Sequence, residues 1–113
     1  MATVDECREA LHKFAEQMSD DPKKVKKLKG FNRALACNIT DLDDVSFHGR
    51  FEGGKLTDIT DGDNDDAEIR MIVKSDDLVA LVAGELNFMK AFTSGQVKVK
   101  ANMMDMMKLK TVL

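Results

Sequence analysis

The sequence predicts an α+β fold in which helices cover one face of a five-stranded, mainly antiparallel sheet. Apolar residues recur at spacings of three and four near the start of the chain, which is typical of a helix buried on one side. From residue 35 onward the period changes to two, as in strands that bury one face. Four such strands follow one another before helical patterns return, and this grouping favours helices on a single sheet face.

Composition limits the class of protein. The chain has 113 residues, which is a usual length for one domain, so residues 1–113 are expected to form a single domain. It is 43% hydrophobic and 33% charged, as in ordinary globular proteins. A net charge of −3 argues against a nucleic-acid partner. No apolar run approaches the roughly 20 residues of a membrane span.

Sequence features at both ends bear on location. Residues 1–6 lack the basic start and apolar run of a signal peptide, and Thr111-Val112-Leu113 does not resemble a peroxisomal targeting signal. Cys7 and Cys37 fall on predicted apolar faces, which suits buried thiols in a reducing compartment. These observations favour a cytoplasmic protein.

Two helices are predicted first. One carries a single apolar stripe formed by Val4, Cys7, Leu11, Phe14 and Met18. Asp21-Pro22 then provides a cap and a first helical turn for a short second helix that ends at Gly30, with Val25 and Leu28 on its buried side.

Alternation predicts the strands. Residues 35–39, 45–51, 55–60 and 69–73 form a meander in which Gly53-Gly54 makes a hairpin turn. A polar loop, residues 61–66, leads to the fourth strand. Helices follow from Ser75 and from Asn87, which end at Gly84 and Gly95. A fifth strand covers residues 97–101, and Asn102 caps a last helix rich in methionine.

One stretch resembles a known family. Residues 84–102 read GELNFMKAFTSGQVKVKAN, with a helix ending in Gly, a Leu-Asn pair, an Ala-Phe pair, Ser-Gly and an alternating lysine strand. This pattern is similar to the signature of the sterol carrier protein 2 (sterol-binding domain) family. KGFN at residues 29–32, AEIRM at residues 67–71 and the order of elements agree, so the resemblance covers residues 28–109 and extends to the whole chain.

Two positions depart from the family pattern. Phe88 stands where the family commonly has Pro, and Ala101 stands where it commonly has Gly. Asn87 still provides the helix cap, and Ala101 requires only an ordinary backbone conformation, so neither change challenges the fold.

The resemblance implies a sterol carrier protein-like sheet covered by helices, with an apolar tunnel between them. It also implies non-catalytic binding and transfer of a fatty acid, fatty acyl-CoA, sterol or phospholipid. No Gly-rich phosphate loop, serine elbow or paired-carboxylate motif suggests an enzyme, and no cofactor is expected. The alternative is a protein-interaction or dimerisation module that uses the same apolar groove.

The predicted ligand contacts are apolar wall residues. Eight methionines in a chain without Tyr or Trp suggest an adaptable lining, and four of them cover an arc of roughly 160° on the last helix. The ten residues expected to contact ligand are Phe47, Phe51, Leu81, Val82, Met89, Phe92, Val99, Met103, Met106 and Met107.

Two charged segments admit both a functional and a plain structural interpretation. The lysines at positions 23, 24, 26, 27 and 29 (Lys23, Lys24, Lys26, Lys27 and Lys29) suit transient contact with an anionic membrane or simply a solvated helix face. Asp61, Asp63 and Asp65 resemble the start of a calcium loop, but Asp66 replaces its glycine, and no metal is expected. The chain is expected to be a monomer or weak dimer.

Overall fold

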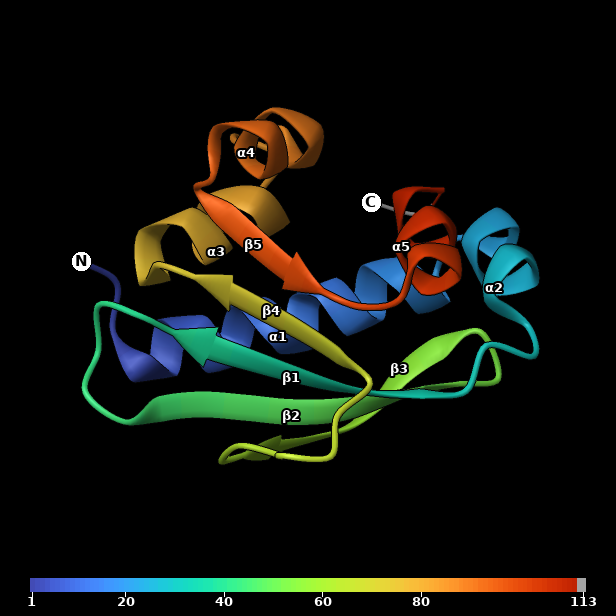
Figure 1. Ribbon diagram of the computed structural model, residues 1–113, viewed down its shortest axis with the longest axis horizontal. Helices are drawn as coiled ribbons and strands as arrows, with labels where there is room; N and C mark the ends of the chain where they lie inside the picture. The colour runs from blue at the N-terminus through green and yellow to red at the C-terminus, as the bar shows by residue number, and fades with distance from the viewer. Residues whose placement is uncertain (112–113) are drawn as a thin grey trace.

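The computed structural model describes residues 1–111, in which five α-helices lie against a five-stranded sheet (Figure 1). Leu113 and its neighbour Val112, part of the segment compared above with a targeting signal, lie outside the described residues. The elements run in the order α1 (Val4–Ser19), α2 (Pro22–Leu28), β1 (Arg33–Ile39), β2 (Val45–Glu52), β3 (Lys55–Asp61), β4 (Ile69–Val73), α3 (Ser75–Val82), α4 (Phe88–Ser94), β5 (Val97–Lys100) and α5 (Met103–Lys110).

The sheet is mixed and mostly antiparallel, with strand order β3-β2-β1-β4-β5. The α+β class is therefore confirmed, but the meander ends after three strands. β4 does not lie beside β3; it pairs in parallel with β1 and antiparallel with β5. The reason is polarity: β3 exposes Asp58 and Thr60 at the sheet edge, whereas β4 buries Ile69 and Val73 and needs neighbours on both sides.

Side-chain caps fix the starts of four helices. Thr3 and Glu6 form a capping box at α1, Asp21 precedes Pro22 at α2, and Asn87 and Asn102 each accept a backbone N–H in α4 and α5. At the other end of α4, Gly95 has φ of 84°, a left-handed conformation that glycine adopts without steric cost.

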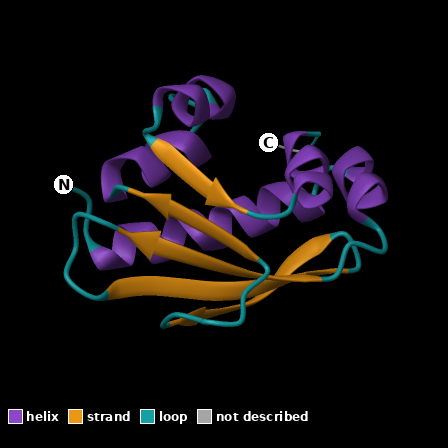
Figure 2. Ribbon diagram, in the orientation of Figure 1, coloured by secondary structure: helices purple, strands orange, loops and turns teal. Residues whose placement is uncertain are grey.

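The helices lie on one side of the sheet, and α1 runs along its whole length (Figure 2). Two clusters of buried side chains pack between the helices and the sheet. The first contains Cys7, Leu11 and Phe47, and the second contains Met18, Leu28, Phe51 and Leu109. Val99 of β5 packs against both clusters, so the region beneath β5 is where the two halves of the core meet.

None of the helices in residues 1–111 has the length and apolar character needed to cross a bilayer.

Candidate functional site

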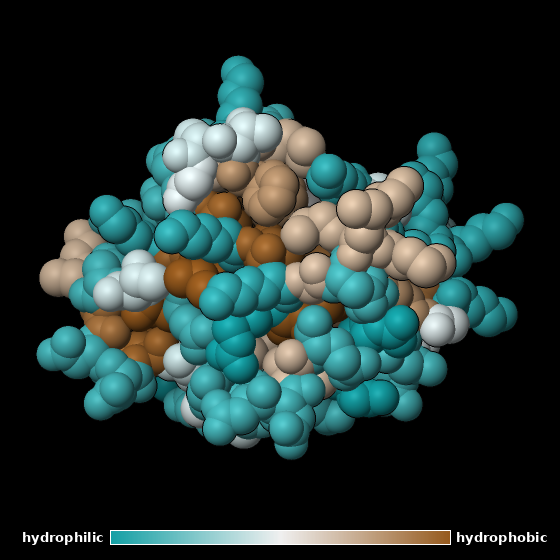
Figure 3. Space-filling model, in the orientation of Figure 1, coloured by the Kyte–Doolittle hydropathy of each residue, from teal (hydrophilic) through white to brown (hydrophobic). Residues whose placement is uncertain are grey.

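An apolar cavity of about 360 Å³ lies between the sheet and the helices. Its floor comes from four strands, through Leu35 of β1, Phe51 of β2, Ile69 and Met71 of β4, and Val99 of β5. Its walls come from all five helices and the α3–α4 loop, through Leu11, Phe14, Gln17, Lys24, Leu78, Leu81, Val82, Gly84, Leu86, Asn87, Phe88, Met89 and Leu109. Figure 3 shows the apolar side chains that gather between α4 and α5 on this side of the molecule.

The period-two pattern of the strands places the cavity floor. In β4, Ile69 and Met71 lie two residues apart and therefore point to the same face, toward the helices. Arg70 lies between them and points to the opposite face, where it contacts Asn38 of β1. The sheet thus presents only apolar side chains to the cavity.

Three polar residues line the cavity, and two of them have structural contacts. Gln17 Nε2 donates a hydrogen bond to the Val82 carbonyl oxygen at 3.3 Å and so joins α1 to the end of α3. Asn87 caps α4 by accepting a bond from the Lys90 amide. Lys24, on α2, is half-buried and forms no ion pair with any residue of the described chain. Among the described lining residues it is the one charged group.

Five of the ten residues predicted to contact ligand line this cavity: Phe51, Leu81, Val82, Met89 and Val99. The other five do not. Phe47 is only 1% exposed because it lies inside the first core cluster, under α1. Phe92 stacks on Phe88 with ring centroids 6.1 Å apart, and Phe88 is the one of the pair that reaches the cavity.

The methionines of α5 lie outside the cavity for a different reason. The buried positions of α5 are Asp105 and Leu109, four residues apart. Asp105 accepts a hydrogen bond from Arg33 Nε at 2.9 Å, and this bond fixes the rotation of the helix. Met103 and Met107 are consequently 79% and 62% exposed, and Met106 is half-buried without lining the cavity.

Several lining residues were not among those predicted from the sequence, and Lys24 is the most informative of them. The run of lysines in α2 predicts that Lys24 belongs to a solvated or membrane-facing surface. Lys24 precedes Leu28 by four residues, which places both on the same face of the helix. Because Leu28 is fully buried, this spacing indicates that Lys24 lies toward the core and not with the exposed lysines.

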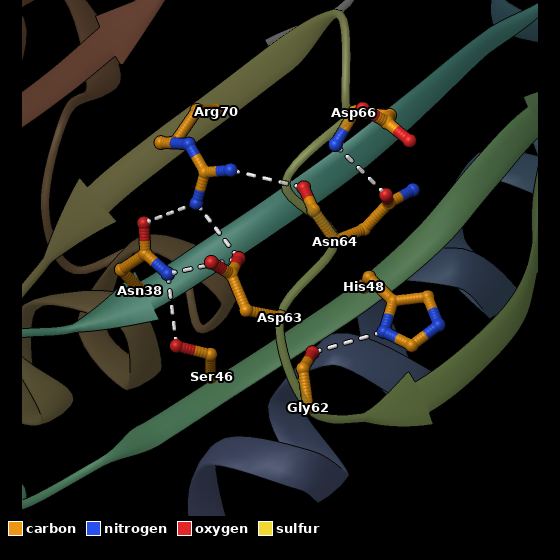
Figure 4. Close-up of polar contacts among 8 residues, drawn as sticks. All are labelled: Asn38, Ser46, His48, Gly62, Asp63, Asn64, Asp66 and Arg70. Carbon is orange, nitrogen blue, oxygen red and sulfur yellow. Dashed lines mark hydrogen bonds and ion pairs between the residues drawn. The ribbon is translucent and has the colours of Figure 1, made fainter.

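Aspartates at the end of β3 and in the loop after it contact arginines. Asp61 forms two hydrogen bonds with Arg8, at 2.9 and 2.7 Å. Asp63 accepts from Arg70 at 2.7 Å, on the sheet face opposite the cavity (Figure 4). These bonds lower the pKa of both carboxyl groups. No group of His, Cys, Asp and Glu side chains within residues 1–111 is arranged to hold a metal ion.

Neither cysteine lies at the cavity surface. Cys7 and Cys37 are both buried free thiols in the first core cluster. Burial raises the pKa of the Cys37 thiol to about 12, so this thiol stays protonated and weakly nucleophilic at neutral pH. It acts as a small core residue.

The same fold occurs in solved structures of sterol carrier proteins. Sterol carrier protein 2-like 2 from Aedes aegypti superposes with a TM-score of 0.70 at 13% identity, covering 96% of this chain and 96% of that one. A palmitated form of the same protein superposes with a TM-score of 0.61 at 13% identity, covering 88% of this chain and 90% of that one. No curated protein sequence matches significantly.

The fold also occurs inside a larger enzyme. The stereoselective inverting sec-alkylsulfatase Pisa1 from Pseudomonas sp. matches with a TM-score of 0.61 and 21% identity over 79% of this chain. This chain spans only 14% of the length of the sulfatase. At these identities the likenesses establish the fold alone.

The family itself is identified from sequence. The model of the SCP-2 sterol transfer family matches residues 11–113, which include all five strands and every residue that lines the cavity. The chain therefore belongs to the SCP-2 sterol transfer family, whose members bind and transfer lipids.

Proposed function

We propose that this protein carries one acyl chain of an anionic lipid, such as a fatty acid, in the cavity beneath β5, and that it releases the lipid chemically unchanged. The observation that carries this proposal is the combination of an apolar cavity with a single charged lining residue. Its volume of about 360 Å³ falls in the range of known small-molecule sites.

The energetics of the cavity favour an occupant. A closed, dry and rigid apolar cavity of 360 Å³ would cost about 9 kcal/mol at roughly 24 cal/mol per Å³, and this value is an upper bound here because the cavity is partly open to solvent. That cost is comparable with the whole stability of an ordinary domain. The cavity is therefore expected to be filled by ligand, and to take up water or close partly when ligand is absent. A sixteen-carbon chain gains about 12 kcal/mol gross on burial, enough to offset much of the association cost of about 4–15 kcal/mol.

Lys24 favours an anionic head group. An ammonium group at the cavity wall can pair with a carboxylate, whereas a sterol hydroxyl gains much less from it. Gln17 and Asn87 can donate additional hydrogen bonds, although each already has a structural partner. The palmitated relative supports the same ligand class, since palmitate is a fatty acyl group.

The test compares two ligands that differ only in their head group. Delipidated protein is titrated calorimetrically with dodecanoate and with 1-dodecanol. The substitution Lys24→Met should weaken dodecanoate binding about fivefold, as expected for a half-exposed ion pair of about 1 kcal/mol, and should leave dodecanol binding unchanged. Lys26→Met is the matched control, because Lys26 is an exposed α2 residue that does not line the cavity.

Two outcomes would contradict the proposal. If neither ligand binds saturably to the wild-type protein, the cavity does not carry acyl chains. If Lys24→Met weakens both ligands equally, the ammonium group does not select the head group, and the preference for anionic lipids is wrong.

A further inference from the structure

The outer surface of α5 exposes apolar side chains that the fold does not use. Met103, Met104 and Met107 are 79%, 81% and 62% exposed. Single exposed apolar residues are common, but three large ones within five residues form a patch. Figure 3 shows pale brown, moderately apolar side chains exposed over α5, beside the apolar region between α4 and α5.

A dense positive charge borders this patch. Lys108 and Lys110 belong to α5 itself, and α2 with its C-terminal cap carries five more lysines. Seven of the 17 basic residues of the chain thus lie on these elements, against two of its 20 acidic residues, Asp105 and Asp21, the N-cap of α2. Asp105 is buried and bonded to Arg33, so it contributes little negative charge to the surface.

The two helices form one continuous face. Lys29 and Phe31, just after α2, share a surface groove with Met103, Met104 and Lys108. Lys27 Nζ also lies 3.5 Å from the Thr111 carbonyl oxygen at the end of α5. Figure 1 shows α2 and α5 side by side.

We propose that α2 and α5 form a docking surface for anionic lipid bilayers, in which the exposed methionines enter the lipid chains and the surrounding lysines contact the head groups. Methionine suits this role because its flexible apolar side chain adapts to irregular surroundings. Lysines near an anionic surface each strengthen binding about fivefold. The surface adjoins the cavity wall, which includes Lys24 of α2 and Leu109 of α5.

Charge argues against a second copy of the chain as the occupant. Two copies joined through this face would bring the exposed lysines of α2 and α5 of one molecule against those of the other, at an electrostatic cost. An anionic bilayer satisfies both properties of the face, since it offers negative charge at its surface and an apolar interior.

The test is sedimentation of the protein with vesicles of phosphatidylcholine alone or with phosphatidylserine added. The triple variant Lys23→Gln/Lys26→Gln/Lys108→Gln should bind anionic vesicles about 100-fold more weakly. The control Lys13→Gln/Lys74→Gln/Lys98→Gln removes the same charge from exposed lysines outside α2 and α5, and its binding should fall no more than about threefold, through long-range charge alone. The double variant Met103→Ser/Met104→Ser keeps all of the lysines, and it should still bind anionic vesicles at least about tenfold more weakly than the wild type.

The outcomes separate docking from lipid carriage. The surface variants should keep the wild-type urea midpoint, which shows that they fold, and should keep wild-type dodecanoate binding in solution. Wild-type protein that sediments no better with anionic than with neutral vesicles would overturn the proposal. The proposal would also be overturned if the two triple lysine variants lost the same affinity for anionic vesicles, or if the methionine variant bound these vesicles as well as the wild type. Absence of dodecanoate binding with vesicle docking intact would refute only the proposed carrier function.

Discussion

Filling the cavity from its floor distinguishes a real void from an interlocked core. Val99 faces the cavity from β5 and packs against both core clusters, so a larger side chain there enters the middle of the void. Val99→Phe adds four carbon atoms, whose burial is worth about 3 kcal/mol gross at roughly 0.8 kcal/mol per carbon. In a fully packed core the same change would instead cost about 1–3 kcal/mol in strain.

The sign of the stability change is therefore the result to measure. We expect the free energy of unfolding of delipidated Val99→Phe, measured in urea, to rise by about 1–2 kcal/mol. This gain is smaller than the gross value because the ring loses conformational freedom and the cavity is partly open. Dodecanoate affinity should fall at least about tenfold, since the ring occupies space that the acyl chain needs.

Lys98→Phe provides the matched control. It introduces the same ring on the same strand, but Lys98 is exposed and does not line the cavity. Its dodecanoate affinity should equal that of the wild type. A loss of stability in Val99→Phe, combined with normal dodecanoate binding, would show that the space beneath β5 does not accept a guest.

Three further predictions concern the surrounding structure. Asp105→Ala should lower the free energy of unfolding by about 1–2 kcal/mol in urea, because it removes the buried hydrogen-bond partner of the half-exposed Arg33 guanidinium. The lowered pKa values of Asp61 and Asp63 mean that their bonded carboxylates stabilise the fold above the unfolded pKa, and this stabilisation is lost as pH falls through the folded values. The melting temperature should thus fall below about pH 4, and it should fall less in the variant Asp61→Asn/Asp63→Asn. A variant with the same pH profile as the wild type would contradict the stabilising role of these two carboxylates. Cys37 should react with a disulfide reagent only when urea unfolds the protein, and rapid labelling in buffer would show that it is accessible.

Local sequence rules predicted most elements because the relevant interactions are local. The cap residues Asp21, Asn87 and Asn102 and the hairpin glycines act within a few residues of their own positions. The place of β4 in the sheet could not be predicted in this way. Its pairing with β1 joins residues more than 30 positions apart, as in Leu35 with Ile69, and alternation gives the face of a strand but not its neighbour.

The rotation of α5 shows a second limit. Four methionines made one side of this helix the apparent apolar face, but the structure buries Asp105 with Leu109 instead. A carboxylate becomes buried when a cation reaches it, and Arg33 lies 72 residues away in the sequence. Hydropathy alone therefore assigned the methionines to the cavity, whereas a long-range ion pair turns them outward.

The arrangement of the two core clusters explains how a cavity can persist between them. α1 contributes Cys7 and Leu11 to one cluster and Met18 to the other, and so ties together the two ends of the sheet. The walls made by α1 and the strands are therefore held apart by side chains that already have close-packed partners. The helices α4 and α5 have only seven and eight residues and border the cavity through few side chains, chiefly Phe88, Met89 and Leu109. Short helices with few buried contacts open at lower free energy than a long central helix. We therefore expect closure around an empty cavity, and entry of an acyl chain, to involve movement of α4 and α5 while α1 and the sheet stay in place.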